Sequence, residues 1–108
     1  MNRNDRSKLL KYDTNALHTF VCTFDRIATK EDPHTGRIYV NTLLIDIKNK
    51  DLEYLAQHIW FRNFPKNSFK HGDRVIIKGR IHFYWKGFNR DIKGVELVDI
   101  EILNTKGV

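Results

Sequence analysis

The sequence predicts an all-β fold, a small barrel of five strands with little helix. Most of the chain after residue 16 alternates between apolar and polar residues with a period of two, in stretches rich in β-branched and aromatic side chains. Glycine, proline and other turn residues separate these stretches. At 108 residues the chain is long enough for one domain with one core, and too short for two.

The first two strands are expected at residues 17–30 and 37–49. In the first, Phe20, Cys22 and Phe24 share one face. The polar sequence EDPHTGR then supplies a turn, and the second strand alternates on both faces. Ile38, Val40, Thr42 and Leu44 lie on one side, and Tyr39, Asn41, Leu43 and Ile45 lie on the other. Two long strands joined by a short polar turn are expected to form a hairpin.

The remaining strands are expected at residues 58–62, 73–85 and 94–103, with residues 63–72 as a connector that contains Pro65. In the fourth strand, Val75, Ile77, Ile81 and Phe83 share a face with Gly79. A glycine in the middle of a strand predicts a bend or bulge at which the sheet curls. Closing five strands into a barrel would remove the exposed edges that an open sheet must protect.

Residues 1–16 are rich in basic residues and poor in apolar ones, and are expected to form a flexible basic arm, with a weak helix signal near residues 7–12. Residues 17–104 would form the domain, and residues 105–108 a tail.

The charge of the chain is unevenly distributed. The formal net charge is +6, and the region from His58 to Lys93 holds only two acids, Asp73 and Asp91, against nine basic residues: Arg62, Lys66, Lys70, Arg74, Lys78, Arg80, Lys86, Arg90 and Lys93. The following stretch, VELVDIEIL, is acidic or neutral. A one-sided basic region of this kind favours a polyanion as partner.

We expect a cytoplasmic protein that does not enter a membrane. The sequence has no run of about 18 apolar residues, and no apolar stretch follows its basic N-terminal residues as a secretory signal would require. Cys22 is the lone cysteine, so the chain cannot form an internal disulfide, which fits a reducing compartment.

The motifs of common enzymes are missing, so we expect no catalytic residue, no metal and no cofactor. The five histidines are scattered and show no metal-ligand spacing, and one cysteine cannot build a zinc site alone. The sequence contains neither a glycine-rich phosphate loop nor a nucleophile elbow.

The segment HIWFR, followed by HGDRVIIKGRIHFYWKG, resembles OB-fold single-stranded DNA-binding proteins of bacteria, phages and mobile elements, and the resemblance extends over residues 17–104. It implies a protein that coats or protects single strands during DNA replication or recombination, with little sequence preference. The chain ends in NTKGV, where bacterial members usually carry an acidic tip, so we expect a divergent phage or mobile-element type. Single-stranded DNA would be the partner, with RNA, replication proteins and homo-oligomerisation left open.

Single strands are held by cations on the phosphates and by aromatic faces stacked on the bases. OB-folds place both in a groove made by strands two and three and two flanking loops. The residues expected to bind are Tyr39, Trp60, Arg62, Lys78, Arg80, Tyr84, Trp85, Lys86, Phe88 and Arg90. For Trp60 and Trp85, a place in the core is an equal alternative. The alternative function is a protein-interaction subunit of a polymerase, primase or helicase assembly, with Leu43, Ile76 and Leu97 on an outer apolar face.

Overall fold

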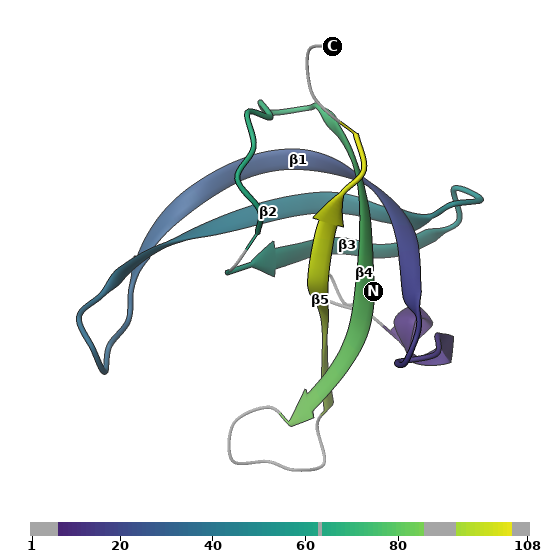
Figure 1. Cartoon of the computed structure of the whole chain (residues 1–108), viewed down its shortest axis with the longest axis horizontal. Coiled ribbons are helices and arrows are strands. Elements are labelled where there is room, and N and C mark those ends of the chain that lie inside the picture. Colours follow the sequence, from purple (N-terminus) through teal and green to yellow (C-terminus); the bar gives the residue numbers. More distant parts are fainter. Residues whose placement is uncertain (1–6, 63, 86–92, 105–108) are drawn as a thin grey trace.

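The computed structural model describes residues 7–62, 64–85 and 93–104, which form one antiparallel sheet of five strands (Figure 1). A short 3-10 helix, η1, precedes the sheet, and the described residues contain no α-helix. The all-β prediction and its five strands are confirmed. No helix within these ranges has the length and apolar character needed to cross a membrane. The elements are η1 (Ser7–Lys11), β1 (Leu17–Glu31), β2 (Ile38–Asn49), β3 (Tyr54–Phe61), β4 (Arg74–Trp85) and β5 (Lys93–Ile102).

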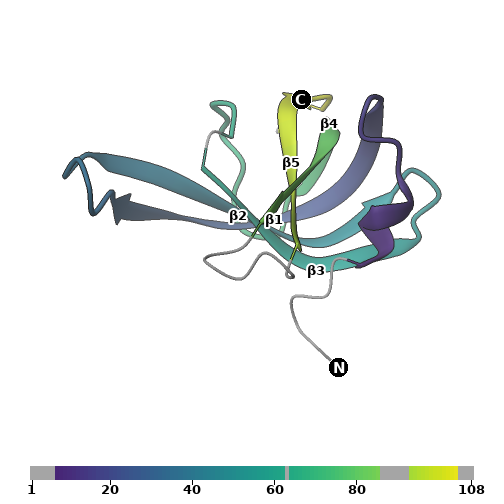
Figure 2. The same ribbon diagram turned by 90° about the horizontal axis from the view of Figure 1, so that it is seen from below.

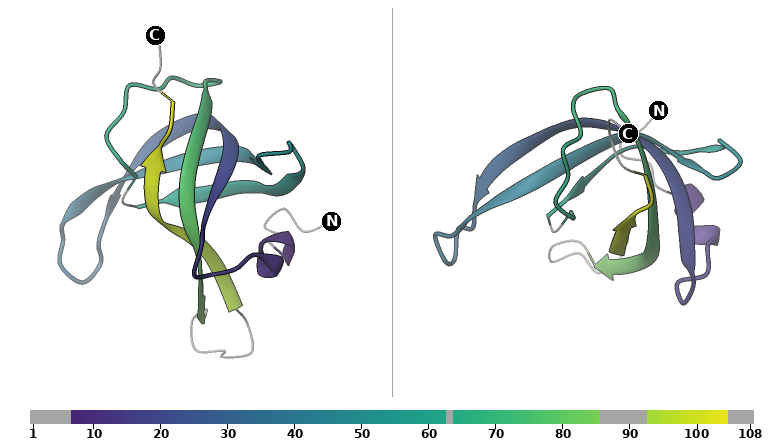
Figure 3. Two further views of the ribbon diagram at one scale, coloured as in Figure 1. Left: turned by 45° about the vertical axis from the view of Figure 1, so that its right-hand side comes forward. Right: turned by 45° about the horizontal axis from the view of Figure 1, so that its top comes forward.

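The strands lie in the order β3-β2-β1-β4-β5, so β1 is central. β1, β2 and β3 follow one another as a meander, and β4 then returns to the free side of β1, which is the arrangement of a Greek key. β1 forms a long arch with the β1–β2 hairpin at one end and η1 near the other (Figures 1 and 2). The two views of Figure 3 show how strongly the sheet is curled.

The core lies on the inner face of the curled sheet, where the alternating apolar residues of all five strands meet. The prediction that Phe20, Cys22 and Phe24 share a buried face is confirmed. Burial raises the pKa of the Cys22 thiol to about 12, so this cysteine is a neutral core residue. Each fully buried side chain of this size contributes about 1.5–3 kcal/mol. The completely buried side chains include Phe20, Leu44, Ile47, Ile59, Val75, Ile77 and Ile81.

Four irregularities in strand pairing reset which side chains face outward. On β1, Asp25 is an extra residue between the pairs Phe24–Leu44 and Arg26–Leu43. Two others lie on β2 and β5, where Asp46 and Asp99 adopt positive φ angles of 51° and 55°, and the fourth lies on β3 at Leu55. Aspartate tolerates this left-handed conformation better than most residues. Such bulges bend a strand and increase its twist, which accounts for the curl of the sheet.

The irregularity predicted at Gly79 is confirmed, although the extra residue lies on the opposite strand, β5. Pairing between β4 and β5 shifts between Lys78 and Arg80. A Cβ atom at Gly79 would stand 2.8 Å from Cδ1 of Ile100, so any larger residue would have to displace the end of that side chain. The glycine thus lets Ile100 of β5 pack closely on β4.

Part of the segment before β1, which was expected as a flexible arm, packs against the sheet through Leu9 and Tyr12. Leu9 is completely buried in the core, and Tyr12 packs against the same cluster. Asn49 Nδ2 donates to Tyr12 Oη at 3.3 Å, and Lys8 Nζ donates to the Tyr54 carbonyl at 3.2 Å. Leu9 and Tyr12 are three residues apart, which places them on one side of a 3-10 turn.

β3 is longer than expected, because it begins at Tyr54 rather than at residue 58. Leu55 and Ala56 are adjacent and both buried, and the pairing between β2 and β3 shifts near Ile47 and Lys48. These two features break the period of two that would have marked the first half of the strand.

Candidate functional site

The outer face of β1, β2 and β3 carries a row of side chains that crosses all three strands. Arg26 pairs with Leu43, and Leu43 pairs with Trp60, so the three lie side by side. The Arg26 guanidinium carbon lies over the Trp60 ring, 5.7 Å from its centroid. Leu43 is buried, whereas Trp60 is half-buried and so keeps part of its ring accessible. With Ile59 and Phe61 buried on the core side, Trp60 lies on the outer face, one of the two alternatives considered for it.

A second pair of an arginine and an aromatic ring lies beside Arg26 and Trp60. The guanidinium carbon of Arg62 is 3.9 Å from the centroid of the Tyr39 ring. Tyr39 pairs across the hairpin with Lys30, which adds another exposed cation at this position. We call Arg26, Tyr39, Trp60 and Arg62 together the aromatic platform. Contacts of this kind are worth about 0.5–1 kcal/mol each at exposed sites, enough to favour one side-chain orientation.

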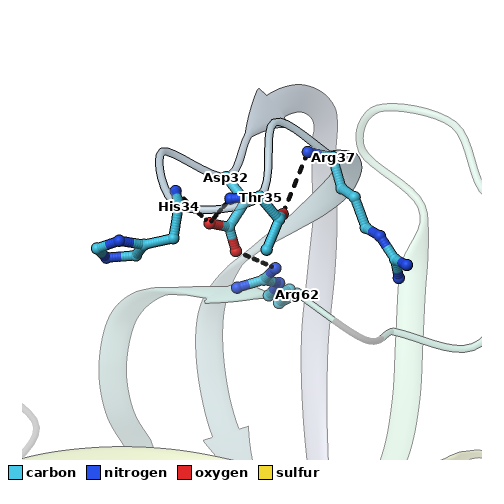
Figure 4. Close-up of polar contacts among 5 residues, drawn as sticks. All are labelled: Asp32, His34, Thr35, Arg37 and Arg62. Atoms are coloured by element: carbon cyan, nitrogen blue, oxygen red, sulfur yellow. Dashed lines mark hydrogen bonds and ion pairs between the residues drawn. The ribbon is translucent and has the colours of Figure 1, made fainter.

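The β1–β2 turn holds Arg62 in place (Figure 4). Asp32 Oδ1 accepts hydrogen bonds from the His34 amide at 2.8 Å and the Thr35 amide at 3.3 Å. Its other oxygen, Oδ2, accepts from Arg62 Nη2 at 3.2 Å. The His34 amide and the Arg62 guanidinium lower the pKa of Asp32 below its usual value, so the carboxylate is charged at neutral pH.

An open depression of about 430 Å³ lies next to Trp60. Its apolar residues are Leu43, Ile45 and the tryptophan itself, and its polar residues are Asp25, Arg26, Gln57 and His58. Arg26 Nη1 donates to Asp25 Oδ2 at 3.0 Å. The other Asp25 oxygen is 3.5 Å from His71 Nδ1, in the connector between β3 and β4.

The outer face of β4 and β5 carries two further predicted residues, Lys78 and Arg80, in a different setting. Arg80 Nε lies 3.9 Å from Asp99 Oδ2, and Lys78 pairs with Glu101 on β5. On β1, Lys78 pairs with Thr19 and Arg80 pairs with Leu17, which lie seven and nine residues before Arg26 along the chain. At about 3.3 Å per residue this is roughly 20 Å along the strand. The structure therefore does not bring Lys78 and Arg80 to the aromatic platform.

The other predicted residues lie at or beyond the end of β4. The backbones of Tyr84 and Trp85 pair with Gly94 and Lys93. Lys86, Phe88 and Arg90 lie outside the described residues.

Arg26 is the member of the platform that sequence reasoning missed. A period of two that buries residues 20, 22 and 24 would also bury residue 26, and the bulge at Asp25 turns Arg26 outward instead. An arginine in a buried register was the available signal, because an unpaired buried charge is costly.

The β1–β2 hairpin extends beyond the body of the sheet and exposes apolar residues on its core-side face (Figure 2). Ile27, Ile38 and Val40 are 58%, 71% and 51% exposed. β4 pairs with β1 only as far as Thr23, and β3 pairs with β2 only from Thr42 onward. The end of the hairpin is thus a two-stranded ribbon that pairs with no other strand of the described residues.

Among the described residues, no group of histidine, cysteine, aspartate and glutamate side chains is arranged to hold a metal ion. Comparisons of the chain with protein-family models, curated proteins and solved structures found no match.

Proposed function

We propose that this chain is an OB-fold protein that binds single-stranded DNA, with little sequence preference, on the outer face of β2 and β3. The fold part of the proposal is supported by the curled five-stranded sheet and its Greek-key order, because the OB-fold is a partly open Greek-key barrel of five strands. The binding face of that barrel consists of strands two and three with adjoining loops. Tyr39, Trp60 and Arg62 lie on or beside those strands.

The observation that carries the functional part is the pairing of a cation with an aromatic ring at two neighbouring positions, Arg26 with Trp60 and Arg62 with Tyr39. A base can stack on an aromatic face whatever its identity, with about 1–3 kcal/mol per base. A guanidinium has five donors. One carboxylate contact therefore leaves Arg26 and Arg62 donors for phosphate. Binding of this kind would sequester and protect a strand without any chemical step.

Binding is tested by fluorescence anisotropy of a labelled oligo-dT of about 30 nucleotides, with duplex DNA and RNA as competitors. We expect the wild-type chain to bind the single strand, the duplex to compete poorly, and a Trp60→Ala, Tyr39→Ala double variant to lose most of the affinity. Circular dichroism would verify that the variant is folded. A folded variant with wild-type affinity would remove the platform from the proposal, and a wild type that binds no oligonucleotide would overturn it.

The second candidate function is a protein-interaction subunit of a polymerase, primase or helicase assembly. Of the three residues first expected to form its surface, Leu43 and Leu97 are buried and Ile76 is half-buried. The exposed Ile27, Ile38 and Val40 of the hairpin favour this candidate instead, because isolated two-stranded ribbons are marginally stable in water and gain from a partner.

An Ile38→Asp, Val40→Asp variant separates the two candidates. If the hairpin binds a protein, this variant loses the partner in co-purification and keeps its affinity for oligo-dT. If it loses DNA affinity and no protein co-purifies with the wild type, the second candidate fails.

A further inference from the structure

The Arg26 side chain occupies a defined place between two other groups of the depression. Its guanidinium lies over the Trp60 ring, 5.7 Å from the centroid, and Nη1 donates to Asp25 Oδ2 at 3.0 Å. The group is planar and presents adjacent N–H donors to a carboxylate. A planar group that lies over an aromatic ring and presents a donor edge to an acid describes a nucleobase as well as it describes an arginine.

We propose that Arg26 holds the place of a guanine base, and that the depression beside Trp60 is a guanine-preferring site within the single-strand path. The proposal rests on the proposed function and adds a base preference at one position. When the base enters, it stacks on Trp60 and donates to Asp25, and Arg26 turns outward towards the adjoining phosphate. The Arg26 side chain is 65% exposed and the Asp25 side chain 14% exposed, so Arg26 loses little burial when it turns outward, and its departure opens the acid to the base.

Guanine is favoured because its Watson–Crick edge is the only one with two adjacent donors, N1–H and the N2 amine. Adenine and cytosine each place an acceptor next to their amine, and thymine places its single N–H between two carbonyl oxygens. An ionised carboxylate only accepts hydrogen bonds, so Asp25 can take two from guanine and at most one from each of the others.

The position of Asp25 supports a base contact over a phosphate contact. A carboxylate repels phosphate, so among the cations of a strand-binding surface it weakens affinity unless it faces a base edge. Asp25 lines the depression together with Trp60 and the apolar Leu43 and Ile45. A volume of about 430 Å³ is in the range of small-molecule pockets and can accommodate a base with its sugar.

The test uses labelled oligo-dT of about 15 nucleotides in which one central thymine is replaced by guanine, adenine, cytosine or hypoxanthine. We expect the guanine oligonucleotide to bind at least fivefold more tightly than the others. Hypoxanthine lacks the N2 amine and should lose most of that advantage. Asp25→Asn should abolish the difference between the bases, and Asp51→Asn, an exposed acid in the β2–β3 turn, should leave it unchanged. Arg26→Ala should enlarge the difference, because the site is then open.

Equal affinity for all central bases would overturn the inference and leave the proposed function standing. A guanine preference that survives Asp25→Asn in a folded variant would also overturn it. Failure of the wild type to bind any of the oligonucleotides would instead overturn the proposed function, and the inference with it.

Discussion

The two outer faces of the sheet both carry arginine, and they differ in what each guanidinium contacts. On β1–β3, Arg26 and Arg62 lie over aromatic rings and each donates to one carboxylate. On β4–β5, Arg80 faces Asp99 and no aromatic contact accompanies it among the described residues. His82 and Glu96 are paired there as well, with Nδ1 and Oε1 2.8 Å apart. Both faces pair their arginines with acids, and among the described residues only the β1–β3 face also places an aromatic ring beside each guanidinium.

This difference shows why the density of basic residues along the chain is a poor guide to a binding surface. The basic stripe of β4 is prominent in the sequence, but the acidic residues of β5 lie opposite it. Arg26 and Arg62 also contact acids, so the charges alone do not separate the two faces, whereas the aromatic rings beside these two arginines do. The density of basic residues along the sequence does not single out Arg26, yet Arg26 lies on the outer face of β1–β3, which carries the accessible aromatic rings.

The largest expected effect is a loss of folding stability when Leu9 of η1, the element next to β3, is truncated. Leu9 is completely buried, and η1 packs near β3. Leu9→Ala should lower the free energy of unfolding by about 2–5 kcal/mol, because it leaves a cavity in the core. Urea denaturation measures this value. The matched control is Leu52→Ala, which changes an exposed leucine and should shift stability by less than about 0.5 kcal/mol. Similar values for both variants would mean that η1 does not stabilise the domain.

Next in size is the loss of stacking at Trp60. Trp60→Ala should weaken binding to oligo-dT by about 5- to 150-fold, the equivalent of about 1–3 kcal/mol. Tyr54 is an exposed aromatic residue at the other end of β3, so Tyr54→Ala is the control in anisotropy measurements and should bind like the wild type. Equal losses in the two variants would show that aromatic content, and not the platform, determines affinity.

A direct comparison of the two faces follows from Arg62→Ala and Arg80→Ala. Arg62→Ala should weaken oligo-dT binding by about tenfold. It should also reduce the slope of log affinity against log salt by about 0.7 for each phosphate that the variant no longer neutralises. Arg80→Ala should change affinity by less than about twofold, because Arg80 lies far from the aromatic platform and no aromatic ring accompanies it among the described residues. If Arg80→Ala had the larger effect, the basic stripe of β4 would be the phosphate path.

The smallest expected effect is the titration of Asp32. Its pKa is lowered from 3.8 by the His34 amide and by Arg62, so its contribution to stability is present above pH 3.8 and disappears as pH falls through the lower, folded value. NMR titration of the wild type should show this carboxyl protonating below pH 3.8. In Arg62→Ala the pKa should rise only part of the way, because the His34 bond remains. An unchanged pKa in that variant would show that Arg62 does not contact Asp32 in solution.

The sequence predicted the strands well and the partners of individual side chains poorly. β1, β2, β4 and β5 follow the period of two and the turn residues, which are local signals. The first half of β3 and the packing of Leu9 could not be predicted from local signals, because two adjacent buried residues and a 3-10 turn do not give a period of two. Of the expected site residues, Tyr39, Trp60 and Arg62 were brought together. Arg26 and the acids opposite Lys78 and Arg80 depend on bulges and on strand register, which one strand's sequence does not reveal.

The bulge at Asp25 determines which chemistry the hairpin shows to the solvent. Beyond it, Arg26, Ala28 and Lys30 lie on the outer face, and Ile27 lies on the core side. If β1 ran through position 25 in a regular ladder, the period of two would place Arg26 on the core side and Ile27 on the outer face. The extra residue therefore sets which of these two side chains the hairpin presents to the solvent, and deleting Asp25 would remove the bulge while leaving Arg26 outside and Ile27 on the core side.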